Sequence, residues 1–366
     1  MKINFLEKAI ENLRINFLNR KNSPSLTFSN KKIDKSTQYN NYGLGFNEVE
    51  RLTTLVIKEQ LPKMIEVEAK RVFEDRISDF KKTIEPMVQQ LKESEIKQLI
   101  EPDTQFMLRE AANTSGRRTE KDIRSVLAHL VVKRIKSDSI CPGESIKDIV
   151  FNEAVTTVGK MTSDQLKIIT LCYILKYTKR LGVSNWDNIN DIFEKSIKPF
   201  IDFKNTQTEF QHIEYVGAGS ISALGSDFCD SFSKEYGFVF NKDISKEKIE
   251  SIDMDINIKN NIFLIENEIY KFKFDTKNIL DKFLDDNNIL DSVKNEIIKI
   301  WNESRLSKQE VENIIKEKND TAKKLLDLWK NSSLSRLLLT SVGIAIAATN
   351  YEQTTGDPLN IDIWIK

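Results

Sequence analysis

Histidine, cysteine, glycine and proline are scarce in this chain. Its 366 residues include 2 His, 3 Cys, 12 Gly and 7 Pro. The cysteines, Cys141, Cys172 and Cys229, are odd in number and lack CxxC spacing, which argues against a disulfide framework or a structural zinc site. We therefore expect a reducing, cytoplasmic environment. Because glycine and proline interrupt helices, their low content favours helices over many tight turns.

Net charge and long apolar runs are also lacking. The 55 Lys and Arg residues balance 55 Asp and Glu residues, so no overall field attracts the protein to nucleic acid or to an anionic membrane. The most apolar run, from Leu337 to Ala348, is interrupted by Thr340 and Ser341, and it is shorter than the roughly 20 residues that span a bilayer. The first residues lack the uninterrupted apolar core of a secretory signal. These features predict a soluble protein without a transmembrane span.

Apolar residues make up 40% of the chain, and most recur at the three- and four-residue spacing of helices. Between residues 262 and 274, however, they alternate on both sides of Asn267, as in a β-hairpin. Ile361, Ile363 and Ile365 alternate in the same way and predict a terminal strand able to pair with that hairpin. We therefore expect a mainly α, multi-helix protein with a small β-hairpin and C-terminal strand sheet near the C-terminus.

The chain exceeds the length at which single hydrophobic cores stop growing, so several units are expected. Its composition suggests three. We expect residues 1–41 to form an amphipathic helix plus polar linker, residues 42–138 a helical domain resembling a hairpin or coiled coil, and residues 139–366 a larger helical domain with the β element. Residues 164–180 are apolar nearly all round the helix, which predicts a buried, central helix in the larger domain.

The first helix carries an apolar stripe with the a/d spacing of packed helices. Its residues are Ile3, Leu6, Ile10, Leu13 and Phe17. Three interpretations remain open: docking on the same chain, self-association, and peripheral contact with a membrane. The last is kept open by eight Lys or Arg against three acidic residues within residues 1–40, because basic amphipathic helices are attracted to anionic lipids. We predict oligomerisation or partner binding through this stripe.

A glycine-rich segment is one candidate for anion binding. Gly217, Gly219 and Ser220 combine flexible backbone with a hydroxyl, and such turns can direct backbone amides at a phosphate. The segment follows a predicted helix and lacks the lysine of a P-loop, so a turn with close packing between helices is the competing interpretation.

A basic stretch between residues 109 and 136 is the second candidate. It includes Arg117, Arg118 and Arg124, which could contact an anion or nucleic acid. Because solvated helix faces often carry such charges, an ordinary surface is the competing interpretation.

The remaining features favour structural roles. His129 and His212 each lie within a helical pattern without a second ligand nearby or HExxH spacing, so we expect no metal, no cofactor and no catalytic residue from sequence. A helix expected over residues 334–351 carries Gly343 and Ala347 four residues apart, a spacing that lets a neighbouring backbone approach closely.

Four strings together resemble a known family: YGLGFNEVE at 42–50, HIEYVGAGSIS at 212–222, SSLSRLLLTSVGIAIAATNYEQTTG at 332–356 and LNIDIWI at 359–365. The chain resembles an uncharacterised bacterial family named only by locus tags. That resemblance implies a continuous fold from about Tyr42 onward but no reaction. In that family a histidine often precedes the last segment that contains Asn, whereas this chain has Ala348 at the position. No role of that histidine is therefore assigned to this chain.

These observations favour a non-enzymatic helical protein that functions in interaction or assembly. It would bind a protein partner or associate with itself. The resemblance suggests a role in bacterial stress or anti-phage defence. Two alternatives are a nucleotide- or nucleic-acid-binding protein and a membrane-active effector.

Overall fold

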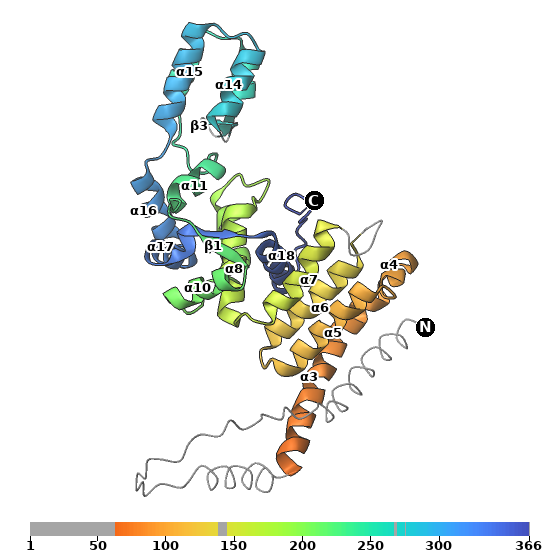
Figure 1. The fold of residues 1–366 in the computed structure, drawn as a ribbon. Coiled ribbons are helices and arrows are strands. Elements are labelled where there is room, and N and C mark those ends of the chain that lie inside the picture. Colours follow the sequence, from red (N-terminus) through yellow and green to blue (C-terminus); the bar gives the residue numbers. More distant parts are fainter. Residues whose placement is uncertain (1–62, 138–144, 267–268, 275, 366) are drawn as a thin grey trace, which may run out of the picture. The chain divides into compact units, whose positions relative to one another are not determined.

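A computed structural model describes residues 63–137, 145–266, 269–274 and 276–365 (Figure 1). The prediction of a mainly α protein is confirmed. The chain divides into two compact units, residues 1–159 and 160–366. Within the described residues, every helix is too short or too polar to cross a membrane.

The first unit is built from helices alone in its described part. They are α3 (Lys63–Gln89), α4 (Glu93–Gln98), α5 (Pro102–Arg117), α6 (Lys121–Ile135) and α7 (Ile146–Val158). Helices α3, α5 and α6 pack against one another, and α7 packs against α5 and α6. Their apolar stripes meet in a core that includes Phe80, Ile84, Ala111, Leu127 and Val131, all fully buried, and burial of such side chains is the main driving force for this packing.

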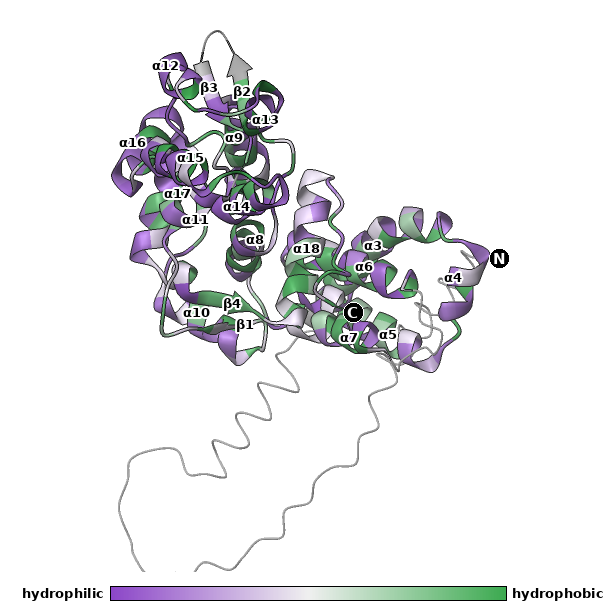
Figure 2. Cartoon of the chain, turned by 90° about the horizontal axis from the view of Figure 1, so that it is seen from above, coloured by the Kyte–Doolittle hydropathy of each residue, from purple (hydrophilic) through white to green (hydrophobic). Residues whose placement is uncertain are grey.

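The second unit surrounds helix α8 (Ser163–Tyr177), which packs along α18 (Ser341–Thr355). Figure 2 shows hydrophobic residues along both helices. Thr162 caps α8 through its hydroxyl, and Gln165 bonds back to the Thr162 amide, so both ends of the capping box are satisfied. The predicted central helix over residues 164–180 is confirmed, although it ends at Tyr177.

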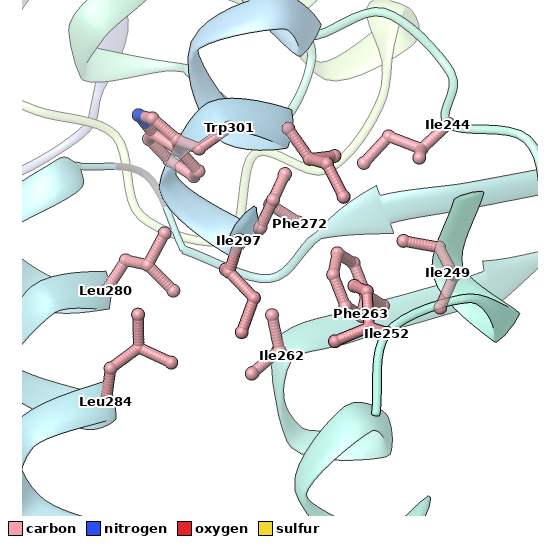
Figure 3. Packing of buried hydrophobic residues seen from close by; sticks show 11 residues of the cluster. Ile244, Ile249, Ile252, Ile262, Phe263, Phe272, Leu280, Leu284, Ile297 and Trp301 are labelled. Carbon is pink, nitrogen blue, oxygen red and sulfur yellow. The ribbon is translucent and has the colours of Figure 1, made fainter. Parts of the chain in front are cut away.

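Shorter helices complete this unit. They are α9 (Trp186–Asp191), the π-helical turn η3 (Ile192–Ile197), η4 (Lys198–Phe200), α10 (Gln207–Tyr215), α11 (Phe228–Glu235), α12 (Lys246–Glu250), α13 (Ile256–Ile262), α14 (Lys277–Asp286), α15 (Asp291–Ser304), α16 (Lys308–Lys318), α17 (Asp320–Asn331) and η5 (Ser333–Arg336). Between α13 and α14, the predicted hairpin is confirmed as β2 (Phe263–Glu266) and β3 (Ile269–Phe272), which pair antiparallel. Figure 3 shows the apolar cluster around this hairpin, where Phe272 meets Trp301 edge to face with ring centroids 4.9 Å apart.

The second strand pair was not predicted. β1 (Gly219–Ile221) pairs antiparallel with β4 (Leu337–Leu339), which lies inside the span expected to be a helix from residue 334 to 351. The helix α18 begins only at Ser341, because the Thr340 hydroxyl caps it by accepting from the Gly343 amide. Because β4 is an uninterrupted apolar run, its periodicity does not distinguish a buried strand from a buried helix.

The predicted terminal strand is wrong. Residues 361–365 form a turn in which the amides of Trp364 and Ile365 donate to the Ile361 carbonyl, at 2.9 and 3.0 Å. Ile361 and Ile365 are buried, whereas Ile363 is 68% exposed. The buried positions are therefore four residues apart, and the alternation seen in the sequence does not correspond to the two faces of a strand.

Candidate functional site

The glycine-rich segment folds as a turn followed by strand β1. Gly217 has φ of +79°, and its amide donates to the Glu214 carbonyl at 3.0 Å, which satisfies the end of α10. A Cβ on Gly219 would lie 2.8 Å from the Leu338 carbonyl oxygen, so this glycine lets the two strands approach. These contacts support the close-packing interpretation. Ser220 lies on strand β1 and is exposed. Anion binding by this segment stays a prediction, and the Gly217 amide already donates its hydrogen bond to Glu214.

The three candidate arginines have different environments within the first unit. Arg124 is 6% exposed and pairs with Asp79 at 3.2 Å. Arg118 is half-buried and pairs with Glu120 at 2.9 Å. Arg117 is exposed. Two of the three guanidinium groups are thus committed to ion pairs inside the chain, and nucleic-acid binding stays a prediction that rests mainly on Arg117.

Both histidines have hydrogen-bond partners, His129 within its own helix α6 and His212 on the neighbouring helix α8. The Nδ1–H of His129 donates to the Ser125 carbonyl one turn earlier, at 2.9 Å. The Nδ1–H of His212 donates to the Gln165 side-chain oxygen at 3.1 Å, and the Gln165 amide group donates to Glu209 at 2.7 Å. Within the described parts of the chain, no group of three or more His, Cys, Asp or Glu side chains is placed to hold a metal ion.

The predicted oligomerisation stripe lies outside the described residues. It comprises Ile3, Leu6, Ile10, Leu13 and Phe17. Self-association and membrane contact through it stay predictions.

An ion network that was not predicted from the sequence is buried in the first unit. Arg134 on α6 and Asp148 on α7 are both fully buried and lie 3.2 Å apart, N to O. Arg134 also reaches Asp103 on α5 at 3.1 Å, and the Ser137 hydroxyl donates to Asp148 at 2.7 Å. Both aspartates lie in the first turn of their helix and Arg134 in the last turn of its own, so all three complement helix dipoles. The network joins the three helices α5, α6 and α7.

A cleft in the second unit is the strongest candidate for a functional site. Its volume is about 330 Å³, within the range of sites that bind small ligands or side chains. Six segments line it: the end of α8, the residues that follow α8, the turn η3, the end of α11, α18 near its end and the segment that follows α18. This site could not be predicted from the sequence, because those segments are far apart along the chain.

The floor of the cleft is apolar and aromatic. Ile174, Phe232, Tyr236 and Tyr351 are each at most 8% exposed. The Tyr351 hydroxyl is within 3.0 Å of the Ser196 hydroxyl on η3, so each has a hydrogen-bond partner. The π-helical form of η3 sets the position of Ser196, and such turns recur at functional sites in other proteins.

Charged side chains of both signs line the rim. Lys179, Arg180 and Asp357 are exposed, and Glu235 is half-buried. The Tyr236 hydroxyl accepts a hydrogen bond from the Arg180 amide at 3.2 Å, which holds the basic segment against α11.

Electrostatics distinguish two groups in this cleft. Burial raises the pKa of Glu235, and the nearby Lys179 only partly offsets that effect. Burial likewise raises the pKa of Tyr236 to about 12, so its hydroxyl stays protonated at neutral pH. The arrangement can bind a group that combines an apolar body with a charge, and burial favours the protonated form of Glu235 relative to an exposed glutamate.

A protein-family model matches this chain from residue 43 to residue 365. Its description is a locus-tag style name ending in "-like" and states no reaction, ligand or partner. Searches of curated proteins and of solved structures found no match. The chain therefore belongs to the bacterial family that the sequence strings suggested, one known by a locus-tag style name.

Proposed function

We propose that this protein is a non-enzymatic helical interaction protein, and that it binds a short segment of a partner protein in the cleft at the end of α8. The observation that carries the proposal is the combination of a buried aromatic floor with a rim of both charges. An apolar side chain of the partner would occupy the floor, while its flanking charged groups would pair with the rim. Buried aromatic floors supply most of the energy in such contacts, and rim charges supply orientation.

The cleft suits one or two side chains rather than a long peptide. Its volume of about 330 Å³ is near the lower limit for sites that hold drug-sized ligands. Lys179 and Arg180 come from one segment, whereas Glu235 lies on α11. A bound segment with an acidic and a basic group on either side of an apolar residue would match both.

Removing the rim carboxylate should weaken binding. Peptides selected from a random library on the immobilised full chain should bind Glu235→Gln about tenfold less tightly than the wild type, because a hydrogen bond to a charged group is lost. The matched control is Asp230→Asn, since Asp230 lies exposed on the same helix and pairs with Lys234. Since the pKa of Glu235 is raised, binding should weaken as pH falls through that raised value, because protonation removes the charge.

Two results would contradict this proposal. One is a library selection in which no peptide is enriched more strongly on the wild-type protein than on the Glu235→Gln variant. The other is equal loss of affinity in Glu235→Gln and Asp230→Asn, which would place the peptide elsewhere on α11.

We also propose that the chain assembles with itself through the apolar stripe of the first helix. Light scattering should give a larger mass for the full chain than for a variant that begins at Asn41, because the a/d stripe is lost. Equal monomeric masses for the two proteins would reject assembly through this helix.

A cytoplasmic location is part of the same proposal. Cys172 and Cys229 are buried free thiols, as in proteins of the reducing cytoplasm. A role in stress or anti-phage defence is supported only by the resemblance described above.

A further inference from the structure

A second cleft of the larger unit lies where α17 ends and η5 begins. Its volume is about 390 Å³. Side-chain amides, hydroxyls and two cations make up the lining, together with Phe210, and no carboxylate lines it. It shares no lining residue with the cleft at the end of α8.

Arg336 is the central group of this cleft. Its side chain makes one hydrogen bond, to the Ser333 hydroxyl at 3.0 Å, and it has no carboxylate partner among the residues that the structure describes. Arg134 and Arg124 of the first unit, by contrast, each pair with an aspartate. A guanidinium group has five N–H donors, so most donors of Arg336 remain available to a ligand.

The position of Arg336 is well defined. Its carbonyl accepts from the Ser222 amide at 2.9 Å, which ties it to the β1–β4 ladder. The Ser333 hydroxyl that accepts from Arg336 donates in turn to the Gln207 side chain at 3.0 Å. The guanidinium group is therefore held by a chain of hydrogen bonds rather than left to rotate in solvent.

Lys330 adds a second positive charge. It shares Glu312 with Lys316, at 2.5 and 2.6 Å, so one carboxylate faces two ammonium groups. Hydrogen bonds from Lys316 and then from Lys330 lower the pKa of Glu312, which keeps its charge at −1 near neutral pH. Lys330 and Arg336 both line the cleft and no carboxylate of the described residues does, so the lining favours anions.

We propose that this cleft binds the phosphate group of a small molecule. The fork of Arg336 would donate two hydrogen bonds to phosphate oxygens, a geometry that suits guanidinium groups. Lys330 would supply charge, and the hydroxyl of Ser332 and the amide of Asn205 would complete the polar surroundings. This site is separate from the cleft proposed to bind a peptide, and it would give the protein a second class of ligand.

Inorganic phosphate tests the site directly. Calorimetric titration of the full chain at constant ionic strength should show binding that becomes about tenfold weaker in Arg336→Gln, because charged hydrogen bonds are lost. Lys330→Gln should also weaken binding. Lys324→Gln should leave it unchanged, since Lys324 lies on the same helix but pairs with Asp202 outside the cleft.

Adenosine monophosphate and ribose distinguish the sources of the phosphate. Tighter binding of the nucleotide than of inorganic phosphate, lost in Arg336→Gln, supports the site with a nucleotide as ligand. Equal binding of the two phosphates supports it with phosphate alone. The site is rejected if no phosphate binds, if ribose binds as well as the nucleotide, or if Arg336→Gln binds like the wild type. Should Arg336→Gln fail to fold by circular dichroism, Arg336→Lys decides: unchanged affinity rejects the guanidinium fork, and weaker affinity supports it.

Discussion

Arg134→Ala should lower the free energy of unfolding of the first unit by about 3–5 kcal/mol. The side chains of Arg134 and Asp148 are both fully buried, so removing the cation leaves an uncompensated carboxylate in the core. Asp103 also loses a partner, although it is 40% exposed and can be solvated in part. The expected cost is large because desolvation of an unpaired charge is added to the lost packing.

Denaturant unfolding followed by circular dichroism measures this effect. Lys136→Ala is the matched control, since Lys136 lies exposed at the end of the same helix and should change stability by at most about 0.5 kcal/mol. A double variant, Arg134→Met with Asp148→Asn, should cost clearly less than the sum of the single changes, because neither charge is then left alone. Equal effects of Arg134→Ala and Lys136→Ala would show that the network contributes nothing.

Gly343→Ala should destabilise the second unit by about 3 kcal/mol or more, the upper end of the range for overpacking. A Cβ at this position would lie 1.8 Å from the carbonyl oxygen of Ala218. That oxygen also accepts from the Thr340 amide at 3.2 Å, so moving it away would disturb the β1–β4 ladder. Neither backbone can shift without losing a contact on its other side, which is why one methyl group has a large effect.

Thermal unfolding of the full chain can measure the loss. Ser341→Ala is the matched control: Ser341 is exposed, lies two residues earlier in the same helix, and should tolerate alanine with little change. An unchanged melting temperature for Gly343→Ala would mean that α18 and the segment before β1 are not in contact in solution.

Several elements could be predicted because their signals are local. The apolar faces of α8 and the alternation around Asn267 each lie within one short stretch, and both elements were found where expected. The strand β4 was mistaken for part of a helix, because a short apolar run has no periodicity of its own. The turn at residues 361–365 was mistaken for a strand because three alternating isoleucines are too few to distinguish a strand from a turn.

Neither cleft could be predicted. The first is lined by residues as far apart as Ile174 and Leu359, and the second by residues between Asn205 and Arg336. No spacing rule relates such positions. Arg134 did offer a signal: it lies on the apolar stripe of its helix between Val131 and Ile135, where a cation needs a buried partner, but its partners could not be identified.

Apolar periodicity, capping residues and the scarcity of glycine and proline determine by themselves that this protein is helical and where most helices lie, since backbone conformation responds to near neighbours. Tertiary structure alone decided which glycine permits contact between backbones, which arginine is buried in an ion network and which is left facing a cleft. Those properties depend on which residues the folded chain brings to within a few ångströms of one another, and the order of residues along the chain does not give those distances.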